Sequence, residues 1–258
     1  MLEVALEAAR AGAAVLRQAG LGRRAGASKG PGDWVTEFDR ASEDAILEVL
    51  ARRTPEVPVL AEEAGGRWQP TMWTVDPLDG TTNFTRGLPV VGVSVGLLRD
   101  GIPELGCVVA PWLDLEIAGG RGIGAWLNGE ELPRLEIAGE RPLDGCILAT
   151  GAPFRHKERL PRYAPVALGA QRRFEDLRRM GAAALDLSWC AAGRLDGYFE
   201  LGLGTWDIAA GAAVLLAVGG RITDWEGGES WVRSGNILAG SPRVVEALLE
   251  LARDPAER

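Results

Sequence analysis

The sequence predicts an α+β first half, residues 1–140, and an α/β second half, residues 141–258, within one layered molecule. Two patterns predict this fold class. The first half begins with helical patterns and continues with a run of short apolar segments. After about residue 140, short apolar segments alternate with helical patterns. The 258 residues are 47% hydrophobic, so the chain can bury a substantial core. No repeat or long flexible linker separates the halves, and we expect them to share one continuous interface.

The first half is expected to open with two helices that contribute to the core. Apolar residues recur at helical spacing within residues 2–18 and again within residues 41–50. Short apolar runs then predict strands at residues 57–61, 72–75, 91–98, 102–110 and 115–118. The strands on either side of Arg99-Asp100-Gly101 are expected to form a hairpin, and Asn128-Gly129 is expected to form another tight turn.

The second half is expected to alternate between strands and helices. Its strands are predicted at residues 146–150, 197–201 and 236–239. Its helices are predicted at residues 182–192, 207–218 and 242–252. Strands that alternate with helices in this way form sheets with helices on their faces.

Composition argues against several classes of function. The net charge of −8 disfavours a nucleic-acid or anionic-membrane surface, since both need clustered positive charge. No apolar run is long enough to cross a membrane, and acids stand near the start where a secretory signal carries bases, so a cytoplasmic protein is expected. The single histidine, His156, argues against a Ser-His-Asp triad and is expected to lie on the surface, with a substrate contact as the alternative. Three widely spaced cysteines predict buried, reduced thiols.

The sequence Trp-Thr-Val-Asp-Pro-Leu-Asp-Gly-Thr-Thr-Asn-Phe, residues 73–84, predicts a metal site. It holds Asp76 and Asp79 on a stiff bend after an apolar segment, because Pro77 fixes its own backbone angle and Asp79-Gly80 is a turn dipeptide. Paired carboxylates on such a bend suit a hard divalent cation with oxygen ligands, Mg²⁺ above all. The amides of Gly80, Thr81 and Thr82 that follow could bind a phosphate where a short helix begins. Taken alone, the Asp-Pro-x-Asp-Gly pattern would be an ordinary surface turn.

Four further sequence elements accompany this stretch. They are Asp33-Trp-Val-Thr-Glu-Phe-Asp39, Ala61-Glu-Glu63, Tyr198-Phe-Glu200 followed by Trp206-Asp-Ile-Ala-Ala-Gly211, and Gly219-Gly-Arg-Ile-Thr-Asp224. Together, in this order, the five elements resemble the signature of the inositol monophosphatase family of magnesium-dependent, lithium-sensitive phosphatases. The resemblance implies alternating layers of helices and sheets, the sugar phosphatase fold, with the active site between the two halves.

The resemblance implies a site for two or three Mg²⁺ ions. Carried over residue by residue, the metal ligands are Glu62, Asp76, Leu78 through its carbonyl, Thr81, Asp79 and Asp207. Asp76 would bridge two ions, and Glu63 would serve a third ion or support the ligands. Two alternatives stay open from the residues alone. Glu63 fits a solvated surface acid equally well, and Asp207 also fits the N-terminal cap of a helix.

The catalytic residues that the resemblance implies are Asp39, Thr81 and Glu62. Asp39 would accept a hydrogen bond from the Thr81 hydroxyl and help to activate the attacking water. The alternative for Asp39 is an acid that completes the first turn of a helix.

Substrate contacts are implied for Gly80, Thr81, Thr82, Ala183 and Glu200. Glu200 would bind substrate hydroxyls. The chain departs from the family pattern at two nearby positions. Ala182 replaces a usual Ser or Thr, which removes one polar contact, and Lys29 lies one residue closer to Asp33 than expected, so its place near the metal is open.

The implied activity is hydrolysis of a small polyol phosphate, with inositol monophosphate ranked first and fructose 1,6-bisphosphate a close second. Histidinol phosphate and 3′-phosphorylated nucleotides are further alternatives within the same family. A bisphosphate or nucleotide would call for additional basic groups, and arginine clusters do occur between residues 155 and 179. Such clusters are expected to be solvated or ion-paired, with phosphate contacts as the alternative. A non-catalytic binding relative would be expected to lose metal ligands, and none is lost here. The family also implies a homodimer.

Overall fold

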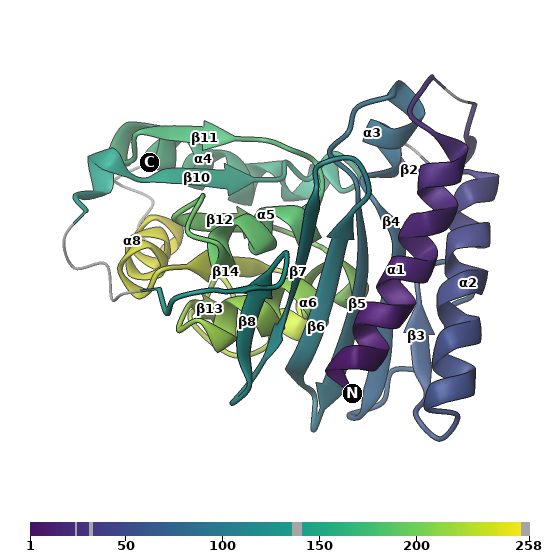
Figure 1. The fold of residues 1–258 in the computed structure, drawn as a ribbon. Helices are drawn as coiled ribbons and strands as arrows, with labels where there is room; N and C mark the ends of the chain where they lie inside the picture. Colours follow the sequence, from purple (N-terminus) through teal and green to yellow (C-terminus); the bar gives the residue numbers. More distant parts are fainter. Residues whose placement is uncertain (24, 31–32, 136–140, 254–258) are drawn as a thin grey trace.

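The structure, a computed structural model, describes residues 1–23, 25–30, 33–135 and 141–253, and it describes Lys29, Asp33 and Trp34 by their backbone alone. Within these residues, helices and sheets alternate in five layers (Figure 1). The layers are a helix pair, a seven-stranded sheet, a second helix pair, a five-stranded sheet and a third helix pair. The predicted fold class is confirmed.

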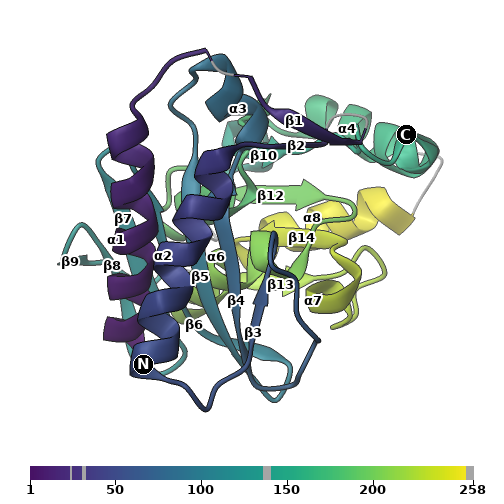
Figure 2. The same ribbon diagram turned by 90° about the vertical axis from the view of Figure 1, so that its right-hand side faces the viewer.

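The first sheet has the strand order β3-β4-β5-β6-β7-β8-β9. The bounds are Val59–Ala61, Met72–Asp79, Gly92–Arg99, Ile102–Ala110, Leu115–Gly120, Gly124–Leu127 and Glu130–Glu131. Neighbouring strands are antiparallel apart from the parallel pair β3–β4. Helices α1 (Leu2–Ala19) and α2 (Glu37–Arg53) cover one face of this sheet (Figure 2). The short antiparallel strands β1 (Ala27–Gly30) and β2 (Asp33–Val35) lie between these helices in sequence.

The second sheet has the strand order β11-β10-β12-β14-β13. The bounds of β10 to β14, in chain order, are Ile147–Thr150, Asp176–Arg178, Gly197–Glu200, Arg221–Thr223 and Ile237–Gly240. Helices α4 (Leu160–Arg173) and α8 (Pro242–Arg253) cover its outer face, and α5 (Ala183–Ala191) and α6 (Thr205–Ala217) fill the layer between the two sheets. Both middle helices are apolar nearly all round, as expected of helices buried between sheets.

Three hydrophobic clusters separate these layers. One lies between the first sheet and α1 with α2, one surrounds α5 and α6, and one lies between the second sheet and α4 with α8. Cys107, Cys146 and Cys190 are free and buried in these clusters, which confirms the predicted reduced thiols.

The middle helix α6 packs directly on the main chain of the first sheet. A Cβ added at Gly106 of β6 would overlap the main chain of Ala210, and one added at Gly96 of β5 would lie 2.9 Å from the Ala210 nitrogen. Glycine at these two positions therefore allows the helix and the sheet to touch. The Ser94 hydroxyl adds a hydrogen bond of 3.0 Å to the Trp206 carbonyl, which fixes the first turn of α6 against β5.

The strands and helices predicted from periodicity are present, with ends shifted by a few residues. The predicted hairpin is confirmed as β5–β6, and the predicted tight turn at Asn128-Gly129 joins β8 and β9. Sequence patterns did not predict α4, the short helices α3 (Thr81–Arg86, of which only the start was expected) and α7 (Trp231–Ser234), or several short edge strands. The predicted boundary at residue 140 lies outside the described residues, and the division into two halves stays a prediction.

No helix among the described residues combines the length and apolar character needed to cross a membrane.

Candidate active site

Strand β4 ends in the two acids of the predicted metal turn. Asp76 is 1% exposed, and its Oδ1 accepts a hydrogen bond of 2.9 Å from the Leu78 amide. The pairing of β4 with β5 shifts register between Asp76 and Asp79, around Pro77, where the strand bends. Asp79 is also buried, and its Oδ2 accepts a hydrogen bond of 2.7 Å from the Ala184 amide in the first turn of α5. This bond ties the first sheet to the middle helix layer.

Asp207 reaches the same place from α6. The helix begins at Thr205, two residues before its predicted start, so Asp207 is its third residue. Gly204 is the N-cap residue, so the alternative prediction of Asp207 as the N-cap is wrong in position. Asp207 assists from the third position, where its Oδ2 accepts a hydrogen bond of 2.6 Å from the Gly204 amide. The carboxylate also meets the two acids of β4. Asp76, Asp79 and Asp207 each offer one oxygen, and these oxygens all lie within 4.8 Å of one another.

The three-carboxylate cluster is electrostatically costly without a cation. Burial, followed by repulsion from Glu62 and Asp79, raises the pKa of Asp76 well above its usual range. Burial and repulsion from Asp207 likewise raise the pKa of Asp79 well above its usual range. Oxygen-only donors whose charges repel one another fit a hard divalent cation, and the residues present therefore fit the implied Mg²⁺.

Asp39 lies directly behind this cluster on α2. Its Oδ2 accepts hydrogen bonds from the Thr36 amide at 2.8 Å and the Thr36 hydroxyl at 2.6 Å, an arrangement that caps the helix. Its Oδ1 lies 3.3 Å from the Thr81 hydroxyl oxygen, which also lies 3.2 Å from the Leu78 carbonyl. Asp39 therefore completes the helix start through one oxygen and faces Thr81 through the other, so both predicted contacts are present, while its part in activating water stays a prediction. Burial raises its pKa.

Glu43 is a buried acid that the sequence reading missed. Its two carboxylate oxygens accept hydrogen bonds from the amides of Glu63 at 2.9 Å and Ala64 at 2.6 Å. These bonds hold the turn after β3 that carries Glu62. The signal was available, because Glu43 follows Asp39 by four residues and precedes Ile46 by three, on the buried stripe of α2. An acid at that position of an amphipathic helix needs a buried partner.

Most of the predicted site residues line one cavity of about 660 Å³ between the two sheets. The predicted site residues on its wall are Glu62, Asp76, Leu78, Asp79, Gly80, Thr81, Thr82, Ala183, Glu200 and Asp207. Asp39 and Glu63 are not on the wall. Lys29 lies in β1, and its side chain falls outside the described part of the chain. The structure thus brings together all but three of the predicted residues.

The cavity wall beyond the acid cluster carries positively charged side chains and the Glu200 carboxyl, which can accept hydrogen bonds. Arg155, His156 and Arg179 line it, with the guanidinium carbons of both arginines within 5.6 Å of the Phe154 ring centroid. The predicted surface position of His156 is borne out by a half-exposed side chain, which nevertheless faces the cavity. Glu200 shares this wall, and burial raises its pKa to about 7.

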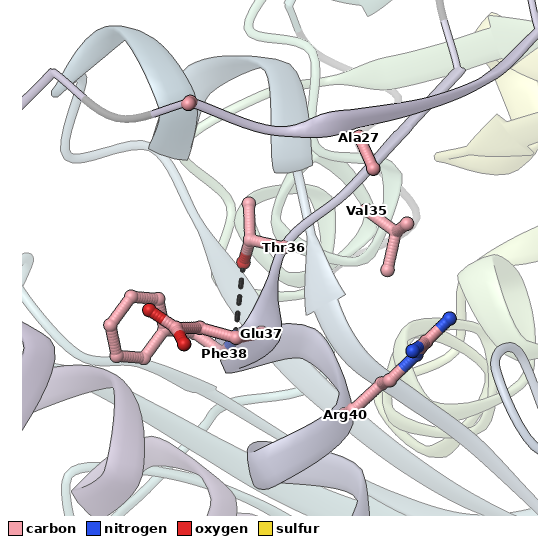
Figure 3. A pocket seen from close by; sticks show the side chains of 7 residues that line it. Ala27, Val35, Thr36, Glu37, Phe38 and Arg40 are labelled. Carbon is pink, nitrogen blue, oxygen red and sulfur yellow. Dashed lines mark hydrogen bonds between the residues drawn. The ribbon is translucent and has the colours of Figure 1, made fainter.

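A second hollow, of about 610 Å³, lies at the start of α2 beside β1 and β2 (Figure 3). Its lining residues are Ala25, Ala27, Val35, Thr36, Glu37, Phe38 and Arg40. This lining brings no group of acids or nucleophiles together, so we place the chemistry in the larger cavity.

The chain resembles known proteins over its whole length. Residues 1–255 match the family model described as "Inositol monophosphatase family". A Pasteurella multocida protein named Nus factor SuhB is 40% identical over 255 residues, which cover 96% of this chain and 94% of that protein. The protein of the same name from Escherichia coli is 42% identical over 229 residues, which cover 88% of this chain and 85% of that protein.

Solved structures agree with these matches. The extragenic suppressor protein suhB from Bartonella henselae superposes with a TM-score of 0.88 at 33% identity and covers 98% of each chain. The inositol monophosphatase from Anabaena superposes with a TM-score of 0.85 at 34% identity, covering 97% of this chain and 94% of that chain. These likenesses, with the acidic cluster, support a phosphatase that binds metal. The chain belongs to the inositol monophosphatase family.

Proposed function

We propose that the protein is a Mg²⁺-dependent phosphomonoesterase that acts on a small phosphorylated polyol. The observation that carries the proposal is the meeting of Asp76, Asp79 and Asp207 within 4.8 Å in a cavity large enough for such a substrate. Membership of a phosphatase family supports the same reaction class. A role limited to binding a partner is disfavoured, because it gives no reason to keep a costly cluster of buried acids.

Two or three Mg²⁺ ions would be held by Glu62, Asp76, the Leu78 carbonyl, Thr81, Asp79 and Asp207. When bound, the cation supplies positive charge that offsets the phosphoryl oxygens and the leaving alkoxide. The chain's own residues orient the water. The Thr81 hydroxyl donates a hydrogen bond to Asp39 Oδ1. The Thr81 oxygen can therefore take a proton from the attacking water as its own hydroxyl proton passes to Asp39, which acts as the base. Burial strengthens Asp39 in this role, since it raises the pKa of the carboxyl.

The substrate would lie along the cavity from the acids to Glu200. Gly80, Thr81 and Thr82 offer amides and hydroxyls to the phosphate, and Ala183 contacts the substrate on the side of α5. Glu200 offers an acceptor to hydroxyl groups of the alcohol. Inositol monophosphate, which carries several hydroxyls and one phosphate, is our first candidate.

Fructose 1,6-bisphosphate is the second candidate, and the arginines of the cavity favour it. Arg155 and Arg179 lie on the wall beyond the acids, where a second phosphate could reach them. Several neighbouring arginines are held elsewhere by acids, such as Arg162 by Glu226 and Arg173 by Glu250. The predicted solvated or ion-paired role therefore describes those two arginines.

The test is release of inorganic phosphate from a panel that includes inositol monophosphate, fructose 1,6-bisphosphate, a nucleotide 3′-phosphate and an aryl phosphate. Each is assayed at equal enzyme concentration with millimolar Mg²⁺ and with excess chelator. We expect Mg²⁺-dependent release, fastest from inositol monophosphate. Preference for the bisphosphate would reverse the ranking, and no release from any ester would reject the proposed function.

We also propose a cytoplasmic symmetric homodimer, because closed two-fold pairs are the commonest soluble assembly and the family resemblance implies one. Light scattering at micromolar concentration should give twice the chain mass of 27.4 kDa. A particle of 27.4 kDa alone would contradict the dimer.

A further inference from the structure

Glu200 is held by its neighbours in a way that the proposed reaction does not by itself require. Tyr198 lies two residues earlier on β12, so both side chains point to the same face of the sheet. The Tyr198 hydroxyl donates a hydrogen bond of 2.5 Å to Glu200 Oε2. Tyr198 is 0% exposed and is not on the cavity wall, so it reaches the substrate only through Glu200.

Gly151 leaves room for the same carboxyl because it has no side chain. It lies at the end of β10 on the cavity wall, and a Cβ added there would overlap both oxygens of the Glu200 carboxyl. The carboxyl is thus placed against the Gly151 main chain on one side and bonded to Tyr198 on the other. Oε1 accepts no hydrogen bond among the described residues, which leaves it available to a hydroxyl of the substrate.

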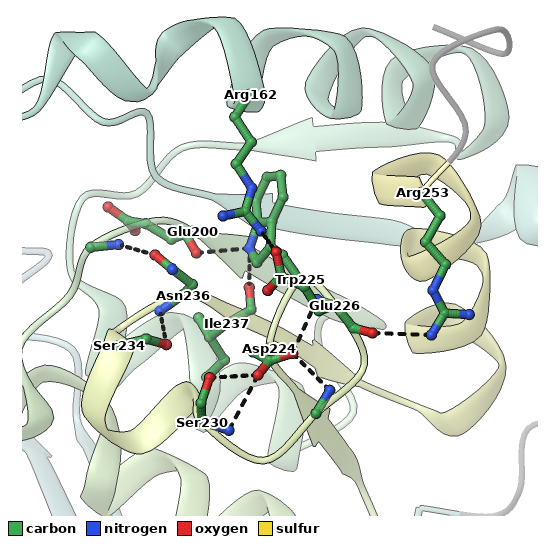
Figure 4. A network of polar contacts seen from close by, with 12 residues as sticks. Arg162, Glu200, Asp224, Trp225, Glu226, Ser230, Ser234, Asn236, Ile237 and Arg253 are labelled. Carbon is green, nitrogen blue, oxygen red and sulfur yellow. Dashed lines mark hydrogen bonds and ion pairs between the residues drawn. The ribbon is translucent and has the colours of Figure 1, made fainter.

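The main chain of Glu200 is fixed independently. The Trp225 indole N–H lies 3.1 Å from the Glu200 carbonyl and 3.2 Å from the Ile237 carbonyl, so it ties the ends of β12 and β14 together (Figure 4). The Arg162 guanidinium covers the Trp225 ring at 5.4 Å and bonds to Glu226. With its backbone held, the position of the carboxyl depends on its side-chain contacts.

We propose that Tyr198 and Gly151 are positioning residues that fix the Glu200 carboxylate as the acceptor for substrate hydroxyls, and so determine specificity for polyol phosphates. This inference rests on the proposed function. Tyr198 would act in two ways, by orienting the carboxyl and by stabilising its charged form.

The charged groups around Glu200 determine what a pH profile would report. They are Asp207 from α6, Asp79 from β4, Asp186 from α5, and Arg155 and Arg179 from the cavity wall. Burial raises the pKa of Glu200 to about 7, Asp207 adds to this, and the Tyr198 hydrogen bond and the two arginines oppose it. Without bound metal the acceptor therefore changes charge near neutral pH, and loss of the Tyr198 bond should move the change of charge to higher pH.

The test compares Tyr198→Phe, Gly151→Ala and Glu200→Gln on inositol monophosphate and on an aryl phosphate that has no hydroxyls. We expect Tyr198→Phe to raise KM for inositol monophosphate about tenfold, since a hydrogen bond to a charged group is lost, with a much smaller change in kcat. When the pH is varied, the KM ratio between the two substrates should change at a higher pH in Tyr198→Phe than in the wild type. Gly151→Ala should raise KM for inositol monophosphate by displacing the Glu200 carboxyl. Glu200→Gln removes the charge of that carboxyl, so its KM gives the largest rise expected from the other two variants.

Tyr163→Phe is the matched control, because it makes the same change at the only other tyrosine. The Tyr163 hydroxyl lies 3.1 Å from the Thr150 hydroxyl on the opposite face of the sheet, and the KM ratio should not change. Equal loss on both substrates in Tyr198→Phe, or an unmoved pH profile, would overturn the positioning role while leaving the phosphatase in place. If Glu200→Gln has no substrate-selective effect, the role of Glu200 is wrong and the inference falls with it. Absence of phosphate release from both esters in the wild type would reject the proposed function itself.

Discussion

Replacing Asp79 or Asp207 by asparagine is expected to lower turnover by on the order of 10³-fold or more. The substitution removes one negative charge from the cluster at almost constant volume, so affinity for a divalent cation falls while packing is kept. Both structural hydrogen bonds survive, because the asparagine carbonyl can still accept from the Ala184 or Gly204 amide. The measurement is kcat during a Mg²⁺ titration, with thermal melting as a check on folding.

A variant that keeps near-normal activity at millimolar Mg²⁺ would show that the two-metal assignment is wrong. Without metal, Asp207→Asn should melt no lower than the wild type, because one source of repulsion against Asp79 is gone. A clearly lower melting temperature would mean that the Asp207 charge supports the fold instead.

Mg²⁺ is expected to stabilise the protein more at high pH than at low pH. Asp76 and Asp79 have a pKa in the folded chain that is raised above the unfolded value of about 3.9. Their contribution to stability is therefore fully present below that unfolded pKa and is lost as the pH rises through the folded pKa. Glu200 behaves alike, with its folded pKa at about 7. The apo protein thus loses stability from these acids as the solution becomes neutral, where a cation can offset their charge.

At a Mg²⁺ concentration about 100 times the dissociation constant, stabilisation is about 2.7 kcal/mol. For a chain of this size it corresponds to a rise of roughly 5–10 °C in melting temperature. Paired melts with and without Mg²⁺ at about pH 5.5 and about pH 8 measure the effect, and Asp79→Asn should show a smaller gain. A gain independent of pH would mean that these carboxyls do not bind the ion.

Local patterns predicted the fold where a segment alternates or repeats on its own. The helical stripe of residues 2–18 and the apolar run at β6 specify their structure without knowledge of partners. Helix α4 was missed because Pro161 and Pro165 interrupt its pattern, although Pro161 stands in the first turn, where proline is tolerated. Strands β11 and β13 are only three residues long and depend on pairing with β10 and β14, which no local pattern contains.

The site residues likewise divide into those that a local pattern places and those that only the tertiary fold brings together. Asp76 and Asp79 share one turn, so their proximity follows from the chain itself. Asp207 joins them only because α6 packs on β5 and β6, and for that residue the family resemblance supplied what local reasoning could not. The bonds of Glu43 to the turn after Glu62 and of Tyr198 to Glu200 satisfy buried polar groups. The need for such partners is predictable from sequence, but their identity depends on the tertiary fold.

The contact of α6 with the first sheet at Gly106 has a consequence for ion selectivity. At Gly106 no side chain lies between the main chain of the first sheet, whose strand β4 carries Asp76 and Asp79, and the main chain of α6, which carries Asp207. The opening between the ligands is consequently set by two rigid elements and cannot widen as a loop can. Mg²⁺ accepts oxygens at about 2.0–2.1 Å, whereas Ca²⁺ needs about 2.3–2.6 Å and more ligands. We therefore expect the discrimination between these two ions by radius to depend on a glycine that would touch neither of them.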